Sequence, residues 1–363
     1  MMQRLAKSLF FTLAIVLLFG SGLLAGEPDT RLTILHVNDY HGRMLPSIDK
    51  QIDPKKGVGG AAYLAAMIKE ERAKNPGGTL LLAAGDMFQG SPESNLSLGA
   101  PVIEIMNELK FDAMVVGNHE FDWGMAVLKT LRKTAQFPFL AANIVDGHGN
   151  LLPGIRPYRI LQCRHAKVAV IGLTTPETAY TTKPDNVKEL IFLSAATVLP
   201  RLIRQARQQG ASIVIVLSHM GLDADKDLAS SVPGIDVIVG GHSHTEVTKP
   251  LKMENGTLIV QAGAYGVYLG VLELNLDPNT GRPFGHADKS GLKLISAGQQ
   301  DRFDRKTALI VKKYEDRIKP KLAVVVGETS VDLMTRRDKE SNLGNLIGRR
   351  NAGIDPQAGS LSA

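Results

Sequence analysis

The feature of this sequence that most limits its possible folds is a series of five apolar runs, each followed by residues that can bind a metal. The run at residues 79–84 shows no alternation of apolar and polar residues, so we expect a strand that is buried on both faces. Predicted helices separate the runs, and strands that alternate with helices indicate an α/β fold with parallel pairings. The residues that follow the five runs are, in chain order, Asp39 and His41, Asp86, Asn118 and His119, His219, and His242 and His244.

The segment at residues 117–122, with the sequence GNHEFD, is at the centre of this pattern. It follows the apolar run 113–116 and precedes a helical pattern at residues 123–135. In an open α/β sheet, ligands bind beyond the carboxyl ends of the strands, so the residues after all five runs are expected to share one site. The alternative is a polar loop that only turns the chain, because short motifs also occur by chance. The similar residues at the four other strand ends favour the shared site.

Carboxylates combined with neutral histidines suit Mn²⁺, Zn²⁺ or Fe²⁺ better than Ca²⁺, which prefers all-oxygen ligands. An aspartate between two ligand groups indicates a bridged pair of metals, which can hold a hydroxide between them and clamp a phosphoryl group. His119 can then donate a proton to the leaving oxygen or stabilise charge on the phosphoryl oxygens, while Asp122 holds its other ring nitrogen. The alternative for His119 is an additional metal ligand or a structural residue.

The N-terminus has the pattern of a secretory signal at residues 1–26. Arg4 and Lys7 form a basic start, residues 8–24 are apolar, and residues 25–26 are small. The alternative is a retained membrane anchor, because the apolar stretch is nearly long enough to span a bilayer. We expect an exported, periplasmic or extracellular protein. Loss of the two basic residues would change the formal charge from +6 to +4, which does not indicate a nucleic-acid partner.

The remaining patterns predict individual elements. Helices are expected at residues 61–74, 101–109, 123–135, 194–209 and 301–319, the last one stopped by Pro320. Residues 257–276 and 321–333 are strand-like, and a helix with an apolar stripe at Leu343, Leu346 and Ile347 begins near residue 340. His36 and the single cysteine, Cys163, are expected to be buried in strands, whereas His148, His165 and His286 have no site-like context.

The motif segments together resemble the exported 5′-nucleotidases of the calcineurin-like metallophosphoesterase superfamily, of the bifunctional UDP-sugar hydrolase/5′-nucleotidase type. Similar segments cover about residues 30–347 in the same order. The segments that carry the resemblance are 38–41 (NDYH), 85–90 (GDMFQG), 117–122 (GNHEFD), 218–219 (SH), 240–244 (GGHSH), 173–177 (LTTPE) and 340–345 (ESNLGN).

The resemblance implies a site with two divalent transition metal ions, which would be Mn, Zn, Fe or Co. It implies that His119 and Asp122 are the catalytic pair, and that Asn118 and His119 contact the substrate. It assigns Asp39, His41 and His244 to one metal, Asn118, His219 and His242 to the other, and Asp86 to both as the bridge. One related type has Gln in place of His244, so the metal preference can differ.

The resemblance also implies a four-layer α/β/β/α sandwich with two mixed sheets flanked by helices. The expected parts are a signal peptide (1–26), a catalytic domain (27–320), the truncated start of a C-terminal domain (321–347) and an unstructured tail (348–363). In the family, the C-terminal domain binds the nucleobase and supplies cationic groups, and after residue 347 the sequence no longer resembles it.

The function implied is hydrolysis of nucleoside 5′-monophosphates to nucleoside and phosphate, by attack of a metal-bridged hydroxide. The expected partner is a small phosphate ester or nucleotide, with no nucleic acid and with a membrane only through an uncleaved signal. The alternatives are a nucleotide-sugar pyrophosphatase, a cyclic phosphodiesterase or a sulfur-ester hydrolase on the same site. A further alternative, of a different class, is a truncated and inactive metal-binding remnant.

Overall fold

The computed structural model describes residues 30–164, 166–298, 302–335 and 339–351. The signal-like residues 1–26, His165 and the end of the tail lie outside the described residues. The chain divides into two compact units, one up to Glu315 and one from Asp316 onward, and each unit is described by itself. Among the helices of the described ranges, none is both long enough and apolar enough to cross a membrane.

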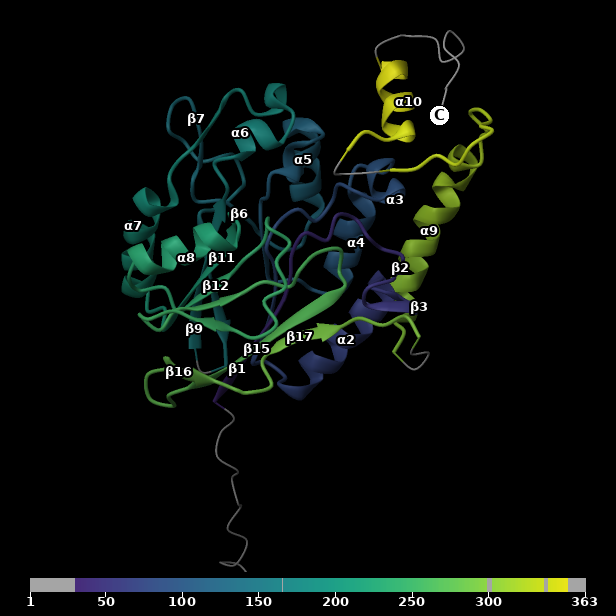
Figure 1. Cartoon of the computed structure of the whole chain (residues 1–363). Coiled ribbons are helices and arrows are strands. Elements are labelled where there is room, and N and C mark those ends of the chain that lie inside the picture. The colour runs from purple at the N-terminus through teal and green to yellow at the C-terminus, as the bar shows by residue number, and fades with distance from the viewer. Residues whose placement is uncertain (1–29, 165, 299–301, 336–338, 352–363) are drawn as a thin grey trace, which may run out of the picture. The chain divides into compact units, whose positions relative to one another are not determined.

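The first unit contains two mixed sheets (Figure 1). The strands of the first sheet are β1 (Arg31–Val37), β4 (Thr79–Ala83), β5 (Ala113–Val115), β6 (Phe139–Leu140), β15 (Tyr268–Leu276), β16 (Pro283–His286) and β17 (Gly291–Leu294). Their order is β16-β15-β1-β4-β5-β6, with β17 also paired to β15. β1 runs parallel to β4 and antiparallel to β15, so this sheet is mixed.

The second sheet has the order β13-β14-β12-β11-β9-β8. Its strands are β8 (Tyr158–Cys163), β9 (Ala166–Thr174), β11 (Ile213–His219), β12 (Val237–Val239), β13 (Leu251–Lys252) and β14 (Leu258–Val260). β9 is parallel to β11 and antiparallel to β8. Two further pairs, β2 (Ser47–Asp49) with β3 (Asp53–Val58) and β7 (Ile144–Asp146) with β10 (Leu190–Phe192), lie outside both sheets.

The helices of the chain separate most of these strands. They are α2 (Ala61–Lys74), α3 (Pro92–Asn95), α4 (Ala100–Glu108), α5 (Gly124–Thr134), α6 (Thr178–Thr181), α7 (Ala195–Gln208), α8 (Leu222–Ser231), α9 (Arg305–Leu322) and α10 (Asn342–Asn351), with short 3₁₀ helices at His119–Phe121 and Pro184–Asn186. The helices predicted at residues 61–74, 101–109, 123–135 and 194–209 correspond to α2, α4, α5 and α7, within one residue at most ends.

Three hydrophobic clusters separate four layers of secondary structure. Successive side chains of a strand point to opposite faces, and in β1 Leu35 and Val37 face the cluster shared with α2, α4 and α5, whereas Leu32 and Ile34 face the second sheet. The third cluster lies between the second sheet and helices α7 and α8, and contains Leu199. The predicted α/β/β/α sandwich is therefore confirmed, and His36 and Cys163 are buried in it as expected.

The strand-like prediction for residues 257–276 is confirmed, because these residues form β14 of the second sheet and β15 of the first. The strand-like prediction for residues 321–333 was wrong. No described residue between 321 and 333 is in a strand: α9 continues through Pro320 to Leu322, and Val325 and Val326 are 80% and 83% exposed. An apolar, β-branched run becomes a strand only where another strand accepts its hydrogen bonds, and no described strand pairs with this one.

The second unit contains the end of α9 and α10. Asn342, the first residue of α10, accepts a hydrogen bond from the backbone N–H of Met334 and donates one to the carbonyl of Asp332, both at 2.8 Å. This side chain ties the preceding loop to the start of the helix. α10 extends to Asn351, beyond residue 347, where the apolar stripe of the sequence stops and we expected structure to end.

Candidate active site

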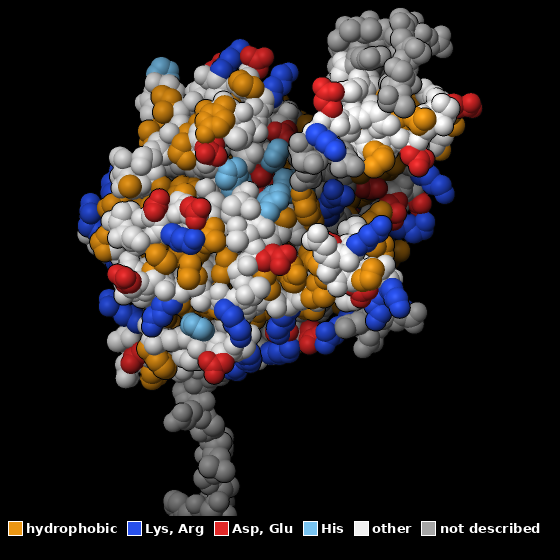
Figure 2. All heavy atoms as spheres, in the orientation of Figure 1, with side chains coloured by type: hydrophobic (Ala, Val, Ile, Leu, Met, Phe, Trp, Pro, Cys, Tyr) orange, Lys and Arg blue, Asp and Glu red, His pale blue; other side chains and the backbone are white. Residues whose placement is uncertain are grey.

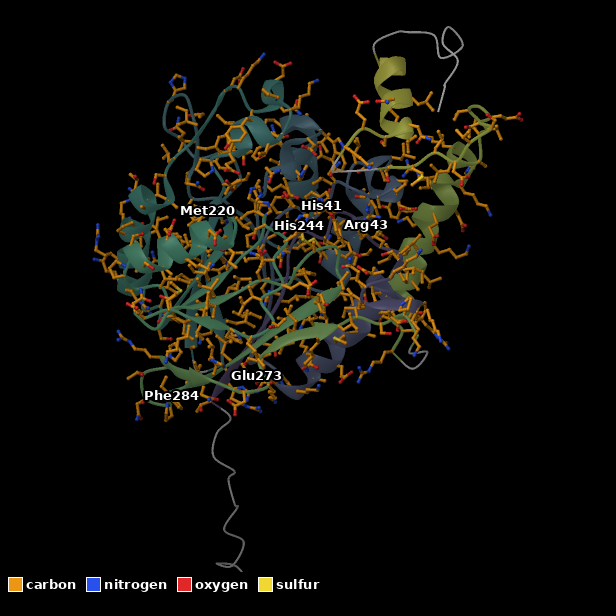
Figure 3. The ribbon with its side chains drawn as sticks, viewed as in Figure 1. His41, Arg43, Met220, His244, Glu273 and Phe284 are labelled. Carbon is orange, nitrogen blue, oxygen red and sulfur yellow. The ribbon has the colours of Figure 1, made fainter. Side chains whose placement is uncertain are left out.

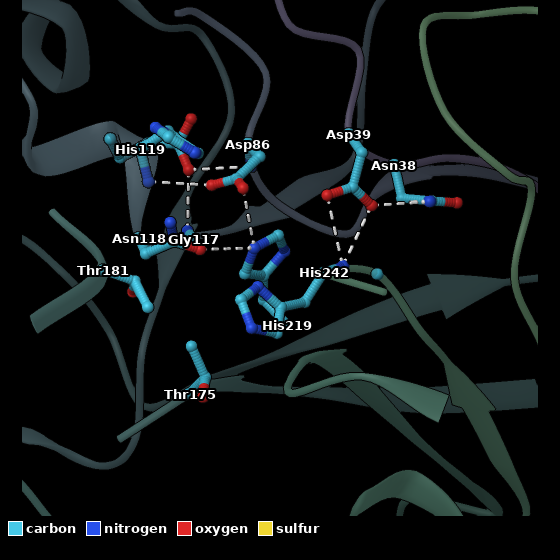
Figure 4. A network of polar contacts seen from close by, with 12 residues as sticks. Asn38, Asp39, Asp86, Gly117, Asn118, His119, Thr175, Thr181, His219 and His242 are labelled. Atoms are coloured by element: carbon cyan, nitrogen blue, oxygen red, sulfur yellow. Dashed lines mark hydrogen bonds and ion pairs between the residues drawn. The ribbon is translucent and has the colours of Figure 1, made fainter. Parts of the chain in front are cut away.

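The predicted site residues meet at the carboxyl ends of strands from both sheets (Figure 4), and Figure 2 shows histidine side chains gathered on one face of the molecule. In the first sheet, β1, β4 and β5 end shortly before Asp39, Asp86 and Asn118. In the second sheet, β11 ends at His219, and β12 ends three residues before His242. The site therefore lies across the two sheets, which explains why residues from five separate strand ends can share it.

The first group of potential ligands consists of Asp39, His41 and His244. The Nε2 atom of His244 is 3.3 Å from an Asp39 carboxylate oxygen and 3.2 Å from Nε2 of His41. Figure 3 shows His41 and His244 side by side, next to Arg43. Asp39 is held in place by the amide of Asn38, at 2.7 Å, and by the backbone N–H of His242, at 2.9 Å.

The second group consists of Asp86, His219 and His242, with Asn118 beside it. Nε2 of His219 is 3.0 Å from Oδ2 of Asp86 and 3.1 Å from Oδ1 of Asn118. His242 also approaches Glu177, whose carboxylate oxygen is 3.3 Å from its Nε2. The seven residues predicted as ligands are thus all brought together, with Asn118, His219 and His242 around Asp86.

The donor atoms of these groups fit metal ions because their lone pairs face one another. Nδ1 of His41 is 2.8 Å from the carbonyl of Gln89, and Nδ1 of His219 is 2.7 Å from the carbonyl of Ala84. A carbonyl only accepts hydrogen bonds, so Nδ1 of each ring carries the proton. In the neutral ring, Nε2 then has a free lone pair that can bind a metal ion. The hydrogen bond from Nδ1 to the carbonyl fixes the tautomer of the ring, in the way that is typical of metal-bound histidines.

The electrostatics of the site also favour bound cations. Burial lowers the pKa of His219, but the carboxylates of Asp86 and Asp39 outweigh burial and raise it to about 10. Burial likewise raises the pKa of Asp86, but His219, His119 and His41 hold it well below its usual range. The buried carboxylates therefore create a negative potential that a proton or a metal ion can neutralise. The donor set suits two divalent transition metal ions.

His119 differs from His41 and His219 because its Nδ1 faces a carboxylate and not a backbone carbonyl. Nδ1 of His119 is 2.6 Å from Oδ2 of Asp122, and Oδ1 of Asp122 accepts a hydrogen bond of 2.7 Å from the hydroxyl of Thr182. The hydrogen bond to Asp122 is the main cause that raises the pKa of His119 to about 9, against the opposing effect of burial. The imidazolium form is therefore favoured at neutral pH, as a proton donor requires.

Glu120 is a residue of the site to which the sequence assigned no role. Its buried carboxylate accepts hydrogen bonds from the backbone N–H groups of Asp86, Met87 and Gly117, at 2.9, 2.8 and 2.7 Å. Burial and the charge of Asp86 raise the pKa of Glu120 to about 7. The Glu120 carboxylate thus holds together the two loops that present Asp86 and Asn118.

Backbone strain is concentrated in the site. Asp39, His41, Asp86, His242 and His244 all have positive φ angles, between 48° and 74°. Such conformations are costly for residues other than glycine and persist where the surrounding structure enforces them, often at functional sites. Five of the seven predicted ligands are held in this way, which keeps their side chains directed at one another.

A pocket of about 410 Å³ opens above the two ligand groups. Besides predicted site residues and Gln89 and Gly90 of the GDMFQG segment, it is lined by Arg43, Thr181 and Tyr265, which the sequence analysis did not select. The Tyr265 ring packs against His41 and His244, and the guanidinium carbon of Arg43 lies 5.2 Å from the centre of that ring. Arg43 is two residues after His41, and this spacing was the one available signal for it.

The histidines that were expected to lie away from the site do so where they are described. His148 is exposed, and Nδ1 of His286 lies 3.2 Å from the carbonyl of Ala287. His165 lies outside the described residues. None of the described histidines beyond the site joins either ligand group.

Comparison with known proteins identifies the family of this chain. The family model described as calcineurin-like phosphoesterase matches residues 32–246. The chain is 34% identical to snake venom 5′-nucleotidase of Crotalus adamanteus, over 91% of this chain and 59% of that protein, and 32% identical to human 5′-nucleotidase, over 92% and 62%.

Among solved structures, a 5′-nucleotidase precursor from Thermus thermophilus has a TM-score of 0.75 at 30% identity, over 89% of this chain and 68% of that one. The chain spans about three fifths of the length of the curated relatives just named. Because the family model covers more than half of the 363 residues, we conclude that this protein belongs to the calcineurin-like phosphoesterase family.

Proposed function

We propose that this protein is a hydrolase of phosphate monoesters that uses two divalent metal ions, of the 5′-nucleotidase type. The observation that carries this proposal is the pair of ligand groups around Asp86, with His119 and Asp122 beside them in one open pocket. Similarity to 5′-nucleotidases over most of the chain supports the substrate class. The full activity of those longer relatives is part of the proposal.

The residues proposed to hold the two ions are Asp39, His41 and His244 for one, and Asn118, His219 and His242 for the other. Asp86 would contact both, since its carboxylate lies against His219 and its charge acts on His41. When bound, such ions supply Lewis-acid stabilisation of the charge that develops on a phosphoryl group.

The protein's own residues would orient the ester and manage the proton. Asp122 holds Nδ1 of His119, so Nε2 is the atom that can give a proton to the leaving oxygen. The backbone N–H of His119 donates a 2.9 Å hydrogen bond to Oδ1 of Asp86 and so fixes the distance between the proton donor and the metal ligands. The side chains of Asn118 and His119 line the pocket and are the proposed phosphoryl contacts.

A second candidate function is supported by Arg43. Among the described residues that line this pocket, Arg43 is the one Lys or Arg, and no described carboxylate pairs with it. A cation in this position can bind a second anionic group, as a nucleotide-sugar pyrophosphatase would require. The same metal groups would serve either substrate.

We also propose that the chain is exported. The basic and apolar pattern of residues 1–26 supports this, as the resemblance to exported 5′-nucleotidases does. Separation of periplasmic or culture fluid from cell contents, followed by N-terminal sequencing of the protein, tests both export and cleavage. A full-length chain found only in the cell interior would contradict the proposal.

The function is tested with the purified chain and its Asp86→Ala variant. We expect close to two transition metal ions per chain, hydrolysis of AMP and of nitrophenyl phosphate, and loss of both ions in the variant. Hydrolysis of UDP-glucose faster than AMP would favour the second candidate. Full metal content without turnover of any ester would instead identify an inactive metal-binding remnant, and full metal content in Asp86→Ala would contradict the bridging role.

A further inference from the structure

A second pocket, of about 330 Å³, lies between the end of α5, strand β6 and strand β8. It is lined by three arginines, Arg132, Arg156 and Arg159, and by no acidic residue. β6 and β8 are the last strands on one side of the two sheets, so the pocket lies on the side of the sandwich. It shares no lining residue with the pocket above the metal ligands.

None of these three arginines has an ionic partner among the described residues. Other arginines of the molecule do have carboxylate partners: Arg31 lies 3.2 Å from Glu273, and Arg207 lies 2.7 Å from Asp236. Nε of Arg132 is moreover buried without a hydrogen-bond acceptor. A buried N–H group without a partner is unfavourable, so an acceptor supplied by a ligand would stabilise this arrangement.

The three arginines are attached to fixed backbone. Arg132 is in the last turn of α5, and its guanidinium lies against Gly154, where an added Cβ would be 2.6 Å from Cζ. Arg156 is bonded to β6 on both sides: its N–H donates to the carbonyl of Phe139, and its carbonyl accepts from Ala141. Arg159 belongs to β8, where it pairs with Val170 of β9. The positive charges are thus brought together by the fold.

We propose that this pocket binds a phosphorylated small molecule, with the phosphate on the arginines. Guanidinium groups match phosphate oxygens in geometry, and three of them without a carboxylate favour a dianion. The volume of 330 Å³ is within the range of small-molecule sites and exceeds what a free phosphate needs, since a water occupies about 30 Å³. Ala135 and Pro138, which are half-buried, line the pocket and offer apolar surface to the organic part.

The chemistry that is recognised, a phosphate group, could come from the product phosphate or from a phosphate ester. The test uses the full chain in EDTA, which stops turnover, and measures binding of inorganic phosphate, AMP and adenosine by isothermal titration calorimetry. The pocket variant is Arg156→Gln with Arg159→Gln. The matched control is Arg201→Gln with Arg204→Gln, two exposed arginines of α7, because it removes the same charge.

We expect AMP or phosphate to bind, and the pocket variant to weaken that binding by about tenfold or more, since charge-assisted hydrogen bonds are lost. The control should bind like the unaltered chain. Tighter binding of AMP identifies the ester as the ligand, and equal binding identifies the phosphate group alone. No binding, equal weakening in both variants, or adenosine binding as tight as AMP would overturn the proposal.

The failure of this proposal can be separated from failure of the proposed function. With metals added, kcat/KM for nitrophenyl phosphate should be the same in the pocket variant and in the unaltered chain, because the two pockets share no residue. Gly154→Ala is a second variant, in which the added methyl group displaces Arg132 and should weaken binding without removing any charge. Unchanged binding in both pocket variants would also overturn the assignment.

Discussion

The partner of each ring nitrogen separates the histidines of the site into two kinds. His41 and His219 present Nδ1 to backbone carbonyls, which leaves Nε2 for a metal. His119 presents Nδ1 to the Asp122 carboxylate instead, and this contact favours the charged ring. The same residue type is therefore prepared for two tasks by its neighbours, and substitution of one kind should not reproduce the effect of the other.

His119→Ala should slow hydrolysis by about 10²–10⁴-fold, the usual range for loss of a general acid, with metal content largely unchanged. Asp122→Asn should produce a smaller loss, because the ring remains but its protonated form is less favoured. Steady-state kinetics with nitrophenyl phosphate and metal analysis of the same samples check both effects. Loss of a metal ion in His119→Ala would show that His119 is a ligand.

His36 is expected to make the stability of the protein sensitive to acid. It is buried in β1, its Nδ1 has no hydrogen-bond partner, and burial lowers its pKa to about 3. Because the folded pKa is below the unfolded value of 6.5, the unfolded chain binds more protons below pH 6.5. The stability that the neutral His36 ring provides is therefore present above pH 6.5 and is lost as the pH falls toward 3.

Protonation of His36 in the unfolded chain is expected to lower the free energy of unfolding by about 1.4 kcal/mol for each pH unit below pH 6.5. Urea unfolding of the unaltered chain and of His36→Leu, at pH 7 and pH 5, measures it. The free energy of unfolding should decrease less from pH 7 to pH 5 in His36→Leu than in the unaltered chain, because the other titrating groups are common to both proteins. Equal decreases would mean that the His36 ring does not stay neutral in the fold.

At the scale of elements, the turns after the strands determine the site more than the strands do. The turn between β5 and the 3₁₀ helix at His119–Phe121 brings Gly117 against Asp86, where an added Cβ would be 2.4 Å from Oδ1. Glu120 on the same turn bonds the backbone of Asp86. The position of the proposed bridging carboxylate therefore depends on the absence of a side chain at residue 117.

Gly117→Ala should displace Asp86 and lower both metal content and activity, although residue 117 has no ligand atom. Gly147→Ala is the matched control, because an added Cβ there has nothing within 4 Å. Metal analysis after dialysis against trace metal checks the two variants. Full metal content and activity in Gly117→Ala would show that the loop can move aside without consequence.

At the scale of the whole molecule, the two sheets divide the site between them. The first sheet supplies Asp39, Asp86 and Asn118, and the second supplies His219 and His242. The cluster of side chains between the sheets therefore also determines the distance between the two halves of the site. The chain spans 59% and 62% of the two curated relatives named above, so large regions of those proteins lie outside the match.

Nucleoside selectivity is the property that we expect to differ most from those longer relatives. The proposed phosphoryl contacts all lie within residues 30–250, whereas recognition of a base needs a stacking surface and hydrogen-bond partners. Because the contacts that we propose for this chain recognise the phosphoryl group, we predict that this chain has a low kcat/KM for nucleotides and cleaves AMP and UMP alike. Kinetics of this chain, and of a chain extended by a family C-terminal domain, check this. A strong preference for one nucleoside that the extension leaves unchanged would contradict it.

The sequence by itself was sufficient to predict the residue types of the site and most of the helices and strands around it. Asp, His and Asn after apolar runs are local patterns, and burial on both faces can be recognised from a run such as residues 79–84. The helices α2, α4, α5 and α7 follow from periodicity and from their flanking residues. These features depend on neighbours in the chain, which is why they can be read without a structure.

Only the tertiary structure decided which parts of the chain meet. It placed β14 and β15 in different sheets, left residues 321–333 without a described partner strand, and brought Glu120 under Asp86. The roles of Arg43 beside Tyr265 and of the three arginines around the second pocket also depend on contacts between distant segments. Pairing of strands and convergence of charges are set by packing in three dimensions, and no local pattern encodes them.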